Sequence, residues 1–157
     1  MALKAKHLTT TAKKPHRWEF YHDEVAYNYR LPNINAALGC AQLEKLPQFV
    51  EDKRKLAQKY IEAFSCLDYS KVLQETTSSK SNYWLNAIIL NEPNRNLVQQ
   101  IIETALQNNY GLRGIWTPLS KLPMYQSCPR MDLSNTNALF DSVICVPSSA
   151  YLGRTHG

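Results

Sequence analysis

The chain has 157 residues, of which 44% are hydrophobic and 20% are charged, and its formal net charge is +5. This length and composition fit one globular domain with a real core, or one small domain with an arm. No apolar run approaches the roughly 20 residues that a membrane-spanning helix needs, and the N-terminus lacks the apolar centre of a secretory signal. Composition therefore predicts a cytoplasmic protein with no membrane partner.

The four cysteines lie far apart in the sequence, at Cys40, Cys66, Cys128 and Cys145. None belongs to a C-x-x-C pair, and no histidines stand at ligand spacing from them, so the sequence predicts neither a metal site nor a disulfide framework. We interpret all four as reduced thiols. Cys40 and Cys145 stand in apolar contexts, which favours packing in the core over chemistry.

The excess positive charge is confined to the beginning of the chain. Five basic residues precede the first acidic residue, Glu19: Lys4, Lys6, Lys13, Lys14 and Arg17. A basic arm of this kind can bind a nucleic acid, a membrane surface or a phosphorylated metabolite, and the threonines at 9–11 add hydroxyls that suit a phosphate. A solvated charged segment without a ligand is the other interpretation of the arm.

Residues 1–30 show little periodicity, and the first strong helical pattern follows them. One helix is predicted from about Asn33 to Leu46 and stops at Pro47, and a second helix continues to about Phe64. These two segments form either a helical hairpin or one kinked helix.

The chain then changes period. Two strands are predicted at Val72–Leu73 and Tyr83–Leu90, and a helix capped by Asn94 follows from about Arg95 to Gln107. After a proline-rich loop the pattern continues to the end of the chain, so the remaining elements are a strand before this loop, a short helix and a last strand: Leu112–Trp116, Asn135–Phe140 and Val143–Val146. The pattern predicts an α/β fold with helices on a small mixed or antiparallel sheet.

The segment from Ala26 to Leu46, AYNYRLPNINAALGCAQLEKL, is the most informative part of the sequence. Its first residues offer phenol hydroxyls, an amide and a guanidinium, which suit phosphate and sugar oxygens: Tyr27, Asn28, Tyr29 and Arg30. Small residues follow in the helix, and Gly39 there costs about 1 kcal/mol against alanine unless close packing offsets it. The helix is therefore either an ordinary buried helix or one that another backbone approaches closely.

This segment resembles the DegT/DnrJ-type sugar aminotransferases, which use pyridoxal phosphate (PLP). The likeness continues through AKHLTTTAK, SNYWLNAIIL, LPMYQSCPRMDL and VICVPSSAYLG, so it covers nearly the whole chain in the family's order. These motifs look like the carboxy-terminal part of the subgroup that aminates UDP-linked 4-keto-6-deoxy sugars for legionaminic acid, bacillosamine and related bacterial glycans. The resemblance implies the small carboxy-terminal domain of a fold-type I aminotransferase at 31–157, preceded by a basic arm and a cofactor-contacting loop at 1–30.

The resemblance also implies roles for individual residues. Asn28 would donate its amide to the PLP phosphate of the neighbouring subunit in a homodimer, and Tyr27 and Arg30 would support that loop. Three arm residues would lie near the nucleotide diphosphate of the sugar substrate: His7, Thr9 and Lys13. A surface histidine without a ligand is the alternative for His7, because one neutral imidazole on an arm proves nothing.

Two more candidates for contacting the substrate lie later in the chain. Trp116 stands beside Arg113 and ahead of Pro118, and Tyr125 would flank the substrate in the same way. Trp84 is interpreted as a core or domain-interface residue, which is also the alternative for Trp116.

Two departures from the family's pattern affect the expected activity. Ala26 stands where the family usually has glycine, and an alanine strains the loop by about 1 kcal/mol or more if the backbone needs a positive φ there. The family's Schiff-base lysine and the aspartate that pairs with the cofactor's ring nitrogen precede the point where this chain begins. The lysines of the arm lie among like charges outside any pocket, so none can replace that lysine. We therefore expect no catalytic residue in this chain and no activity from the chain alone.

Two functions from different classes remain. The first is the carboxy-terminal portion of a PLP-dependent nucleotide-sugar aminotransferase, with glutamate as the amino donor. The second is a non-catalytic module that uses the small-residue helix and the basic arm to bind a partner chain or a nucleic acid. Trp18, Phe20 and Tyr21 follow the basic residues and do not interleave with them, so we expect no nucleic-acid partner.

Overall fold

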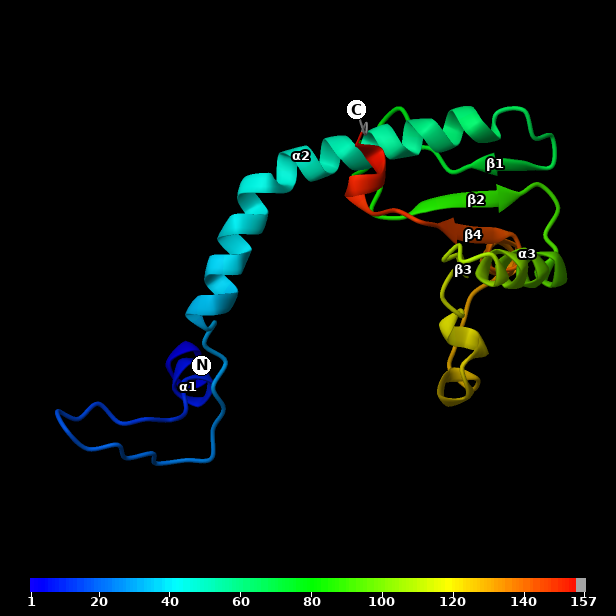
Figure 1. The fold of residues 1–157 in the computed structure, drawn as a ribbon. Coiled ribbons are helices and arrows are strands. Elements are labelled where there is room, and N and C mark those ends of the chain that lie inside the picture. The colour runs from blue at the N-terminus through cyan, green and yellow to red at the C-terminus, as the bar shows by residue number, and fades with distance from the viewer. Residues whose placement is uncertain (155–157) are drawn as a thin grey trace. The chain divides into compact units, whose positions relative to one another are not determined.

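The computed structural model describes residues 1–154, and the chain divides into two compact units, Met1–Lys45 and Leu46–Gly157. Within residues 1–154, four α-helices and four strands follow one another in the order α1, α2, β1, β2, α3, β3, α4 and β4 (Figure 1). No helix in the described part of the chain combines the length and the apolar character needed to cross a membrane. The boundary at residue 30, which was drawn from expected roles, stays a prediction.

The first unit begins with helix α1 (Ala2–Thr9) and contains the start of helix α2 (Asn33–Phe64). Between these helices the chain runs out and back as a long loop, and a bridge joins Thr10 to Asn28 at its base (Figure 1). The weak periodicity of residues 1–30 did not predict helix α1 or this pairing. The basic residues lie on a helix and on a loop that pairs with the aromatic segment.

Backbone hydrogen bonds hold the threonines of the arm to the aromatic segment. The amide of Thr11 donates to the carbonyl of Tyr27 at 3.0 Å, and the amide of Tyr29 donates to the carbonyl of Thr9 at 2.9 Å. Thr11 and Ala12 adopt positive φ angles of 68° and 47°, and Ala12 is completely buried. Two successive residues in this sparsely allowed region reverse the chain sharply after α1.

Helix α2 passes through Pro47 without ending, so of the two predicted alternatives, a helical hairpin and one helix kinked at the proline, the structure excludes the hairpin. An interior proline removes one hydrogen-bond donor and costs about 3 kcal/mol or more. Downstream of the proline, the side chains of Asp52, Leu56 and Ala57 are buried against the second unit, to which this part of α2 belongs. Their packing stabilises the helix where its own hydrogen bonds are interrupted.

The second unit is built on a four-stranded, wholly antiparallel sheet with the strand order β1-β2-β4-β3. The sequence left a mixed or an antiparallel sheet open. Strand register pairs Ser70 with Leu90, and Ile88 with Ile144. In chain order the four strands are short segments with these bounds: Ser70–Val72, Asn86–Leu90, Arg113–Gly114 and Val143–Val146.

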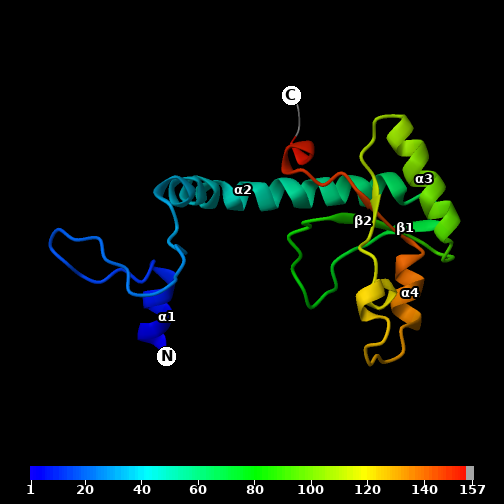
Figure 2. The same cartoon turned by 90° about the horizontal axis from the view of Figure 1, so that it is seen from below.

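Two helices cover one face of this sheet and form its core. The α2 side chains of Tyr60 and Phe64 pack on a buried cluster formed by Val72, Ile88 and Val146. Helix α3 (Arg95–Gln107) packs on a second cluster, which consists of Leu90, Val98 and Ile144. Helix α4 (Ser134–Phe140) lies with α3 at the end of the sheet where β2 ends and β4 begins (Figure 2).

The cysteines divide between the core and the surface. Cys145 is buried in β4, as its apolar context predicted. Cys40 is exposed in the first half of α2, so the prediction that it packs in the core was wrong for this chain. In the structure all four cysteines are free thiols.

The turn at Ala150–Gly153 lies directly against α2, and we expect Gly153→Ala to destabilise the second unit. A Cβ at Gly153 would lie 1.8 Å from the carbonyl oxygen of Asp52, so the turn or the helix would have to move. Such overpacking typically costs about 1–3 kcal/mol, measurable by urea denaturation. Gly111→Ala is the matched control, because nothing lies within 4 Å of its Cβ. Equal midpoints for the two variants would contradict the expected clash.

Candidate functional site

Six of the residues predicted to bind cofactor or substrate lie in the first unit: His7, Thr9, Lys13, Tyr27, Asn28 and Arg30. The pairing between Thr9–Thr11 and Tyr27–Tyr29 brings the two predicted groups together on one hairpin. The sequence placed both groups but gave no signal that they pair. The geometry therefore joins an arm and a loop that were predicted separately.

Asn28 forms a tight turn within the aromatic segment. Its Oδ1 accepts a hydrogen bond from the backbone amide of Arg30 at 3.1 Å, so the side-chain NH₂ group is left to donate elsewhere. The rings of Tyr27 and Tyr29 stack with centroids 5.9 Å apart and an interplanar angle of 12°. Both tyrosines and Arg30 are exposed. The loop thus presents amide, phenol and guanidinium donors together, and these donors fit a phosphate group.

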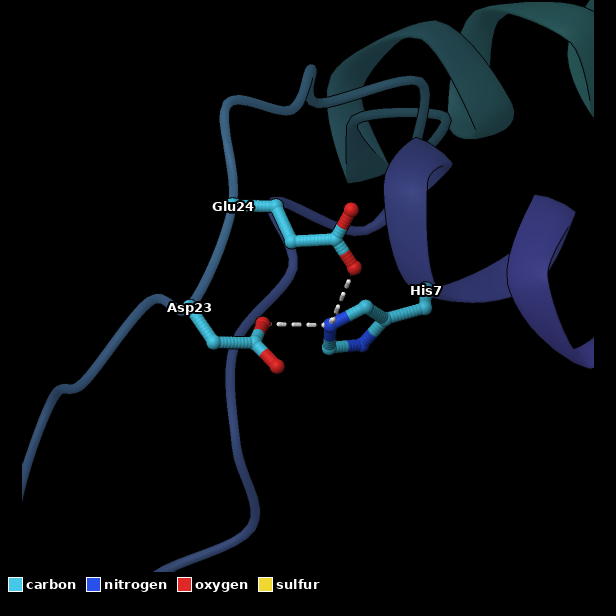
Figure 3. A group of neighbouring side chains, drawn as sticks. All are labelled: His7, Asp23 and Glu24. Atoms are coloured by element: carbon cyan, nitrogen blue, oxygen red, sulfur yellow. Dashed lines mark hydrogen bonds and ion pairs between the residues drawn. The ribbon is translucent and has the colours of Figure 1, made fainter.

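His7 belongs to an ion-pair network at the base of the loop. Its Nε2 lies 2.6 Å from Oδ1 of Asp23 and 3.9 Å from Oε1 of Glu24 (Figure 3). The Nζ of Lys14 lies 3.0 Å from Asp23, and Lys4 pairs with Glu24. Hydrogen bonds from His7 and Lys14 lower the pKa of Asp23 to about 2. Because the two lysines neutralise both carboxylates, we assign no metal to this group.

Thr9 and Lys13 already have partners within the first unit. The hydroxyl of Thr9 donates to the carbonyl of Ala5 at 2.8 Å, and the ammonium of Lys13 lies 3.8 Å from the centroid of the Phe20 ring. A diphosphate near the arm would have to compete with this cation–π contact. The hydroxyl oxygen of Thr9 remains able to accept a hydrogen bond.

Trp116, in the second unit, stacks on Trp84. The two ring centroids lie 6.1 Å apart with an interplanar angle of 27°, and the guanidinium of Arg113 lies 5.1 Å from the centroid of Trp116. The two tryptophans are 64% and 63% exposed, so the interpretation of either one as a core residue was wrong for this chain. The sequence did not predict this pair, because Trp84 precedes α3 in the chain and Trp116 follows it. The pairing of the strands brings the two residues together.

Tyr125 lies in a short 3-10 helix, Pro123–Tyr125, and lines a cavity of 430 Å³. The cavity is formed by the proline-rich loop and the start of α4, and its other lining residues include Pro118, Leu119, Cys128, Arg130 and Leu133. This cavity lies in the second unit, whereas the six candidate residues named first lie in the first unit. The predicted role of Tyr125 at the substrate stays a prediction.

Lys53, in the second unit, was missed by the sequence analysis. Its ammonium donates to the carbonyl oxygens of Trp84 at 3.2 Å and of Ser148 at 2.5 Å, and burial lowers its pKa. A desolvated lysine of this kind can serve chemistry. Here both hydrogen bonds tie the ammonium to the backbone, so Lys53 fixes the segment that carries Trp84.

Arg54 and Glu75 clamp the loop between β1 and β2 onto α2. Nη1 of Arg54 donates to Oε2 of Glu75 at 3.0 Å and to the carbonyl of Ser81 at 2.6 Å. The amide of Ser81 also donates to Glu75 at 2.6 Å. The Arg54 guanidinium and this amide lower the pKa of Glu75 to about 2.

We expect the stability of the second unit to fall as the pH is lowered. The pKa of Glu75 is about 2 in the folded chain against an ordinary value of 4.5, so the unfolded chain binds more protons between these values. The contribution of the ionised Glu75 to stability is complete above its ordinary pKa and is lost as the pH falls toward 2. Melting temperatures measured from neutral pH to pH 2 check this. Glu75→Gln should flatten the profile and Glu103→Gln should leave it unchanged, whereas identical profiles for all three proteins would contradict the clamp.

Comparison with known proteins finds relatives along nearly the whole chain. The sequence model of the DegT/DnrJ/EryC1/StrS aminotransferase family matches residues 1–156. The putative pyridoxal phosphate-dependent aminotransferase EpsN of Bacillus subtilis (strain 168) is 32% identical over 151 residues, which are 94% of this chain and 38% of EpsN. GDP-perosamine synthase of Vibrio cholerae is 36% identical over 110 residues, which are 68% of this chain and 29% of that enzyme.

Solved structures show the same fold. Helicobacter pylori PseC, an aminotransferase involved in the biosynthesis of pseudoaminic acid, superimposes with a TM-score of 0.79 at 22% identity, over 96% of this chain and 41% of PseC. The chain therefore spans well under half the length of the relatives it matches. The family's cofactor is PLP, and the donors of the Tyr27–Arg30 loop fit its phosphate. The chain therefore belongs to the DegT/DnrJ/EryC1/StrS family of sugar aminotransferases.

Proposed function

We propose that the chain is the carboxy-terminal portion of an enzyme that transfers an amino group to the 4-keto carbon of a UDP-linked 4-keto-6-deoxy sugar. The product would enter surface glycan biosynthesis in the cytoplasm. The observation that carries this proposal is the exposed loop at Tyr27–Arg30, where the Asn28 amide is left to donate. The motifs that resemble the UDP-sugar subgroup support the choice of substrate.

In this proposal the loop binds the phosphate of PLP in the neighbouring subunit of a homodimer. The NH₂ group of Asn28 donates to a phosphate oxygen, and Arg30 supplies the positive charge that balances the phosphate. The stacked rings of Tyr27 and Tyr29 stiffen the loop. When bound, PLP supplies an electron-withdrawing ring that stabilises negative charge beside the transferred nitrogen.

The chain by itself is proposed to be inactive. Burial lowers the pKa of Lys53, but its ammonium donates hydrogen bonds to two backbone carbonyls. Lys4 and Lys14 pair with carboxylates on the first unit. Each of these three ammonium groups is therefore already held by a partner within its own unit. PLP added to the chain should therefore be removed by dialysis, and borohydride should not fix it to the protein.

The experiment that tests the function uses the complete enzyme that carries this segment. With ¹⁵N-labelled glutamate, PLP and a UDP-linked 4-keto-6-deoxy sugar, we expect the label in the amino sugar. A parallel reaction with the GDP-linked sugar tests the nucleotide, because one relative is a GDP-perosamine synthase. Label transfer to neither sugar would overturn the proposal. Transfer to the GDP-linked sugar alone would overturn the UDP assignment.

The alternative of a nucleic-acid-binding arm is not favoured by the structure. Lys4 and Lys14 are paired with carboxylates, and Lys13 lies over the ring of Phe20. Three of the five basic residues that suggested this alternative are thus held by partners within the first unit.

A further inference from the structure

Trp84, Trp116 and Arg113 form one exposed surface on the second unit, which we name the indole surface. The indoles stack on each other, and the guanidinium of Arg113 lies over the ring of Trp116. About two-thirds of each tryptophan remains exposed, which leaves ring surface free for a further flat group. Large flat apolar rings beside a cation are the combination that binds bases and phosphates together.

The backbone holds Trp84 in place without any ligand. The buried Tyr83 adopts a positive φ of 45°, a conformation that is rare for a residue with a large side chain. The amide of Trp84 donates to Oδ1 of Asn82 at 3.0 Å, and its carbonyl accepts from Lys53 at 3.2 Å. Strained backbone persists where the surroundings determine it, and it concentrates at binding sites. The indole of Trp84 is therefore presented on a preorganised turn.

Arg113 is placed so that its charge stays available. The strand register aligns Ala87, Cys145 and Arg113 in one row across β2, β4 and β3, so Arg113 lies on a sheet face with two small buried neighbours. Arg113 is exposed, and among residues 1–154 no carboxylate pairs with it. A guanidinium in this state presents its donors to an anion such as a diphosphate.

We propose that the indole surface binds the nucleotide of the sugar substrate, with the base stacked on the indoles and the diphosphate paired with Arg113. This inference rests on the proposed nucleotide-sugar substrate and goes beyond it, because it assigns the base to Trp84 as well as Trp116. It also assigns the diphosphate to Arg113 in place of the arm, where Thr9 and Lys13 already have partners. Stacking on the indoles tolerates any base, so the surface accepts both UDP and GDP.

Tryptophan fluorescence of the full chain tests this site. Trp18→Phe first removes the tryptophan of the other unit, so the signal comes from Trp84 and Trp116. We expect UDP and GDP to quench this fluorescence saturably, and Trp84→Leu and Trp116→Leu each to weaken binding about tenfold. Arg113→Gln should weaken UDP binding and leave uridine binding unchanged. Arg17→Gln, an exposed arginine of the first unit, is the matched charge control.

Four outcomes would overturn the site. One is the absence of quenching by millimolar UDP and GDP, and another is equal quenching constants for all the variants. The third is a chain whose self-association is abolished by Trp84→Leu while nucleotides fail to bind, since the surface would then be a protein interface. The titration needs neither PLP nor turnover, so its failure is distinguishable from failure of the proposed function. If neither tryptophan substitution changes the KM of the complete enzyme for the nucleotide sugar, this result would overturn the site. The proposed function would be unaffected.

Discussion

In the complete enzyme, Asn28→Ala weakens PLP binding by about 1.5 to 3 kcal/mol, because a hydrogen bond to a charged phosphate is lost. The amide is available for that bond, since the backbone amide of Arg30 occupies only Oδ1 of Asn28. The measurement is the dissociation constant of PLP, obtained by equilibrium dialysis of the variant and of the parent enzyme. We expect unchanged circular dichroism, because the side chain is exposed.

Two further variants separate a phosphate contact from a role in the turn. Asn28→Asp keeps the acceptor for the Arg30 amide but removes the NH₂ donor and adds a negative charge, so it should bind PLP more weakly than the alanine variant. Asn35→Ala, an exposed asparagine of α2, is the matched control and should bind PLP normally. Normal PLP affinity in Asn28→Asp would remove Asn28 from the phosphate site and leave it as a turn residue.

Sequence reasoning succeeded where one element carries its own signals. Helix α3 begins at Arg95 and ends at Gln107 as predicted, and Oδ1 of Asn94 accepts from the amide of Leu97 at 3.0 Å. Strand β4 also has its predicted bounds, Val143–Val146, because a short apolar run there is buried along its whole length. Capping and apolar periodicity are local, so they can be read from neighbouring residues.

Sequence reasoning failed where distant residues decide the local structure. Strand β2 was predicted from Tyr83 but begins at Asn86, because the positive φ of Tyr83 and the turn at Asn82 delay it. Residues 1–30 lack periodicity and were interpreted as an arm. The sequence did not predict the backbone hydrogen bonds that join Thr9–Thr11 to Tyr27–Tyr29 within this segment. Such pairing depends on a chain reversal at Thr11 and Ala12, and neither residue is a typical turn former.

The candidate site shows the same division. Asn28 and its neighbours were predicted from the sequence because their chemistry and order resemble a family motif, and their role at the cofactor stays a prediction. The stacking of Trp84 on Trp116, and the hydrogen bonds from Lys53 that hold Trp84, were not found, because each joins residues far apart in the chain. Their contact follows from the antiparallel sheet and not from any local pattern.

The isolated chain should self-associate through the first half of α2. Ile34, Leu38 and Leu43 are 82%, 61% and 67% exposed, and nothing lies within 4 Å of a Cβ built at Gly39. Covering a large aliphatic side chain contributes about 1.5 to 3 kcal/mol, so several such residues on one helix favour association. We expect sedimentation velocity to show dimers or larger species, together with binding of an apolar dye.

Matched variants decide whether this helix is the surface responsible. Leu38→Lys should shift the chain toward the monomer and reduce dye binding, because a charge cannot be buried there without a partner. Leu106→Lys places the same charge on α3, where the leucine is 55% exposed, and should leave the association unchanged. A parent chain that is monomeric at tens of micromolar and binds no dye would contradict the prediction. The exposed helix would then be a stable surface of a self-sufficient chain, and the proposed contact of this segment with a neighbouring subunit would lose its physical support.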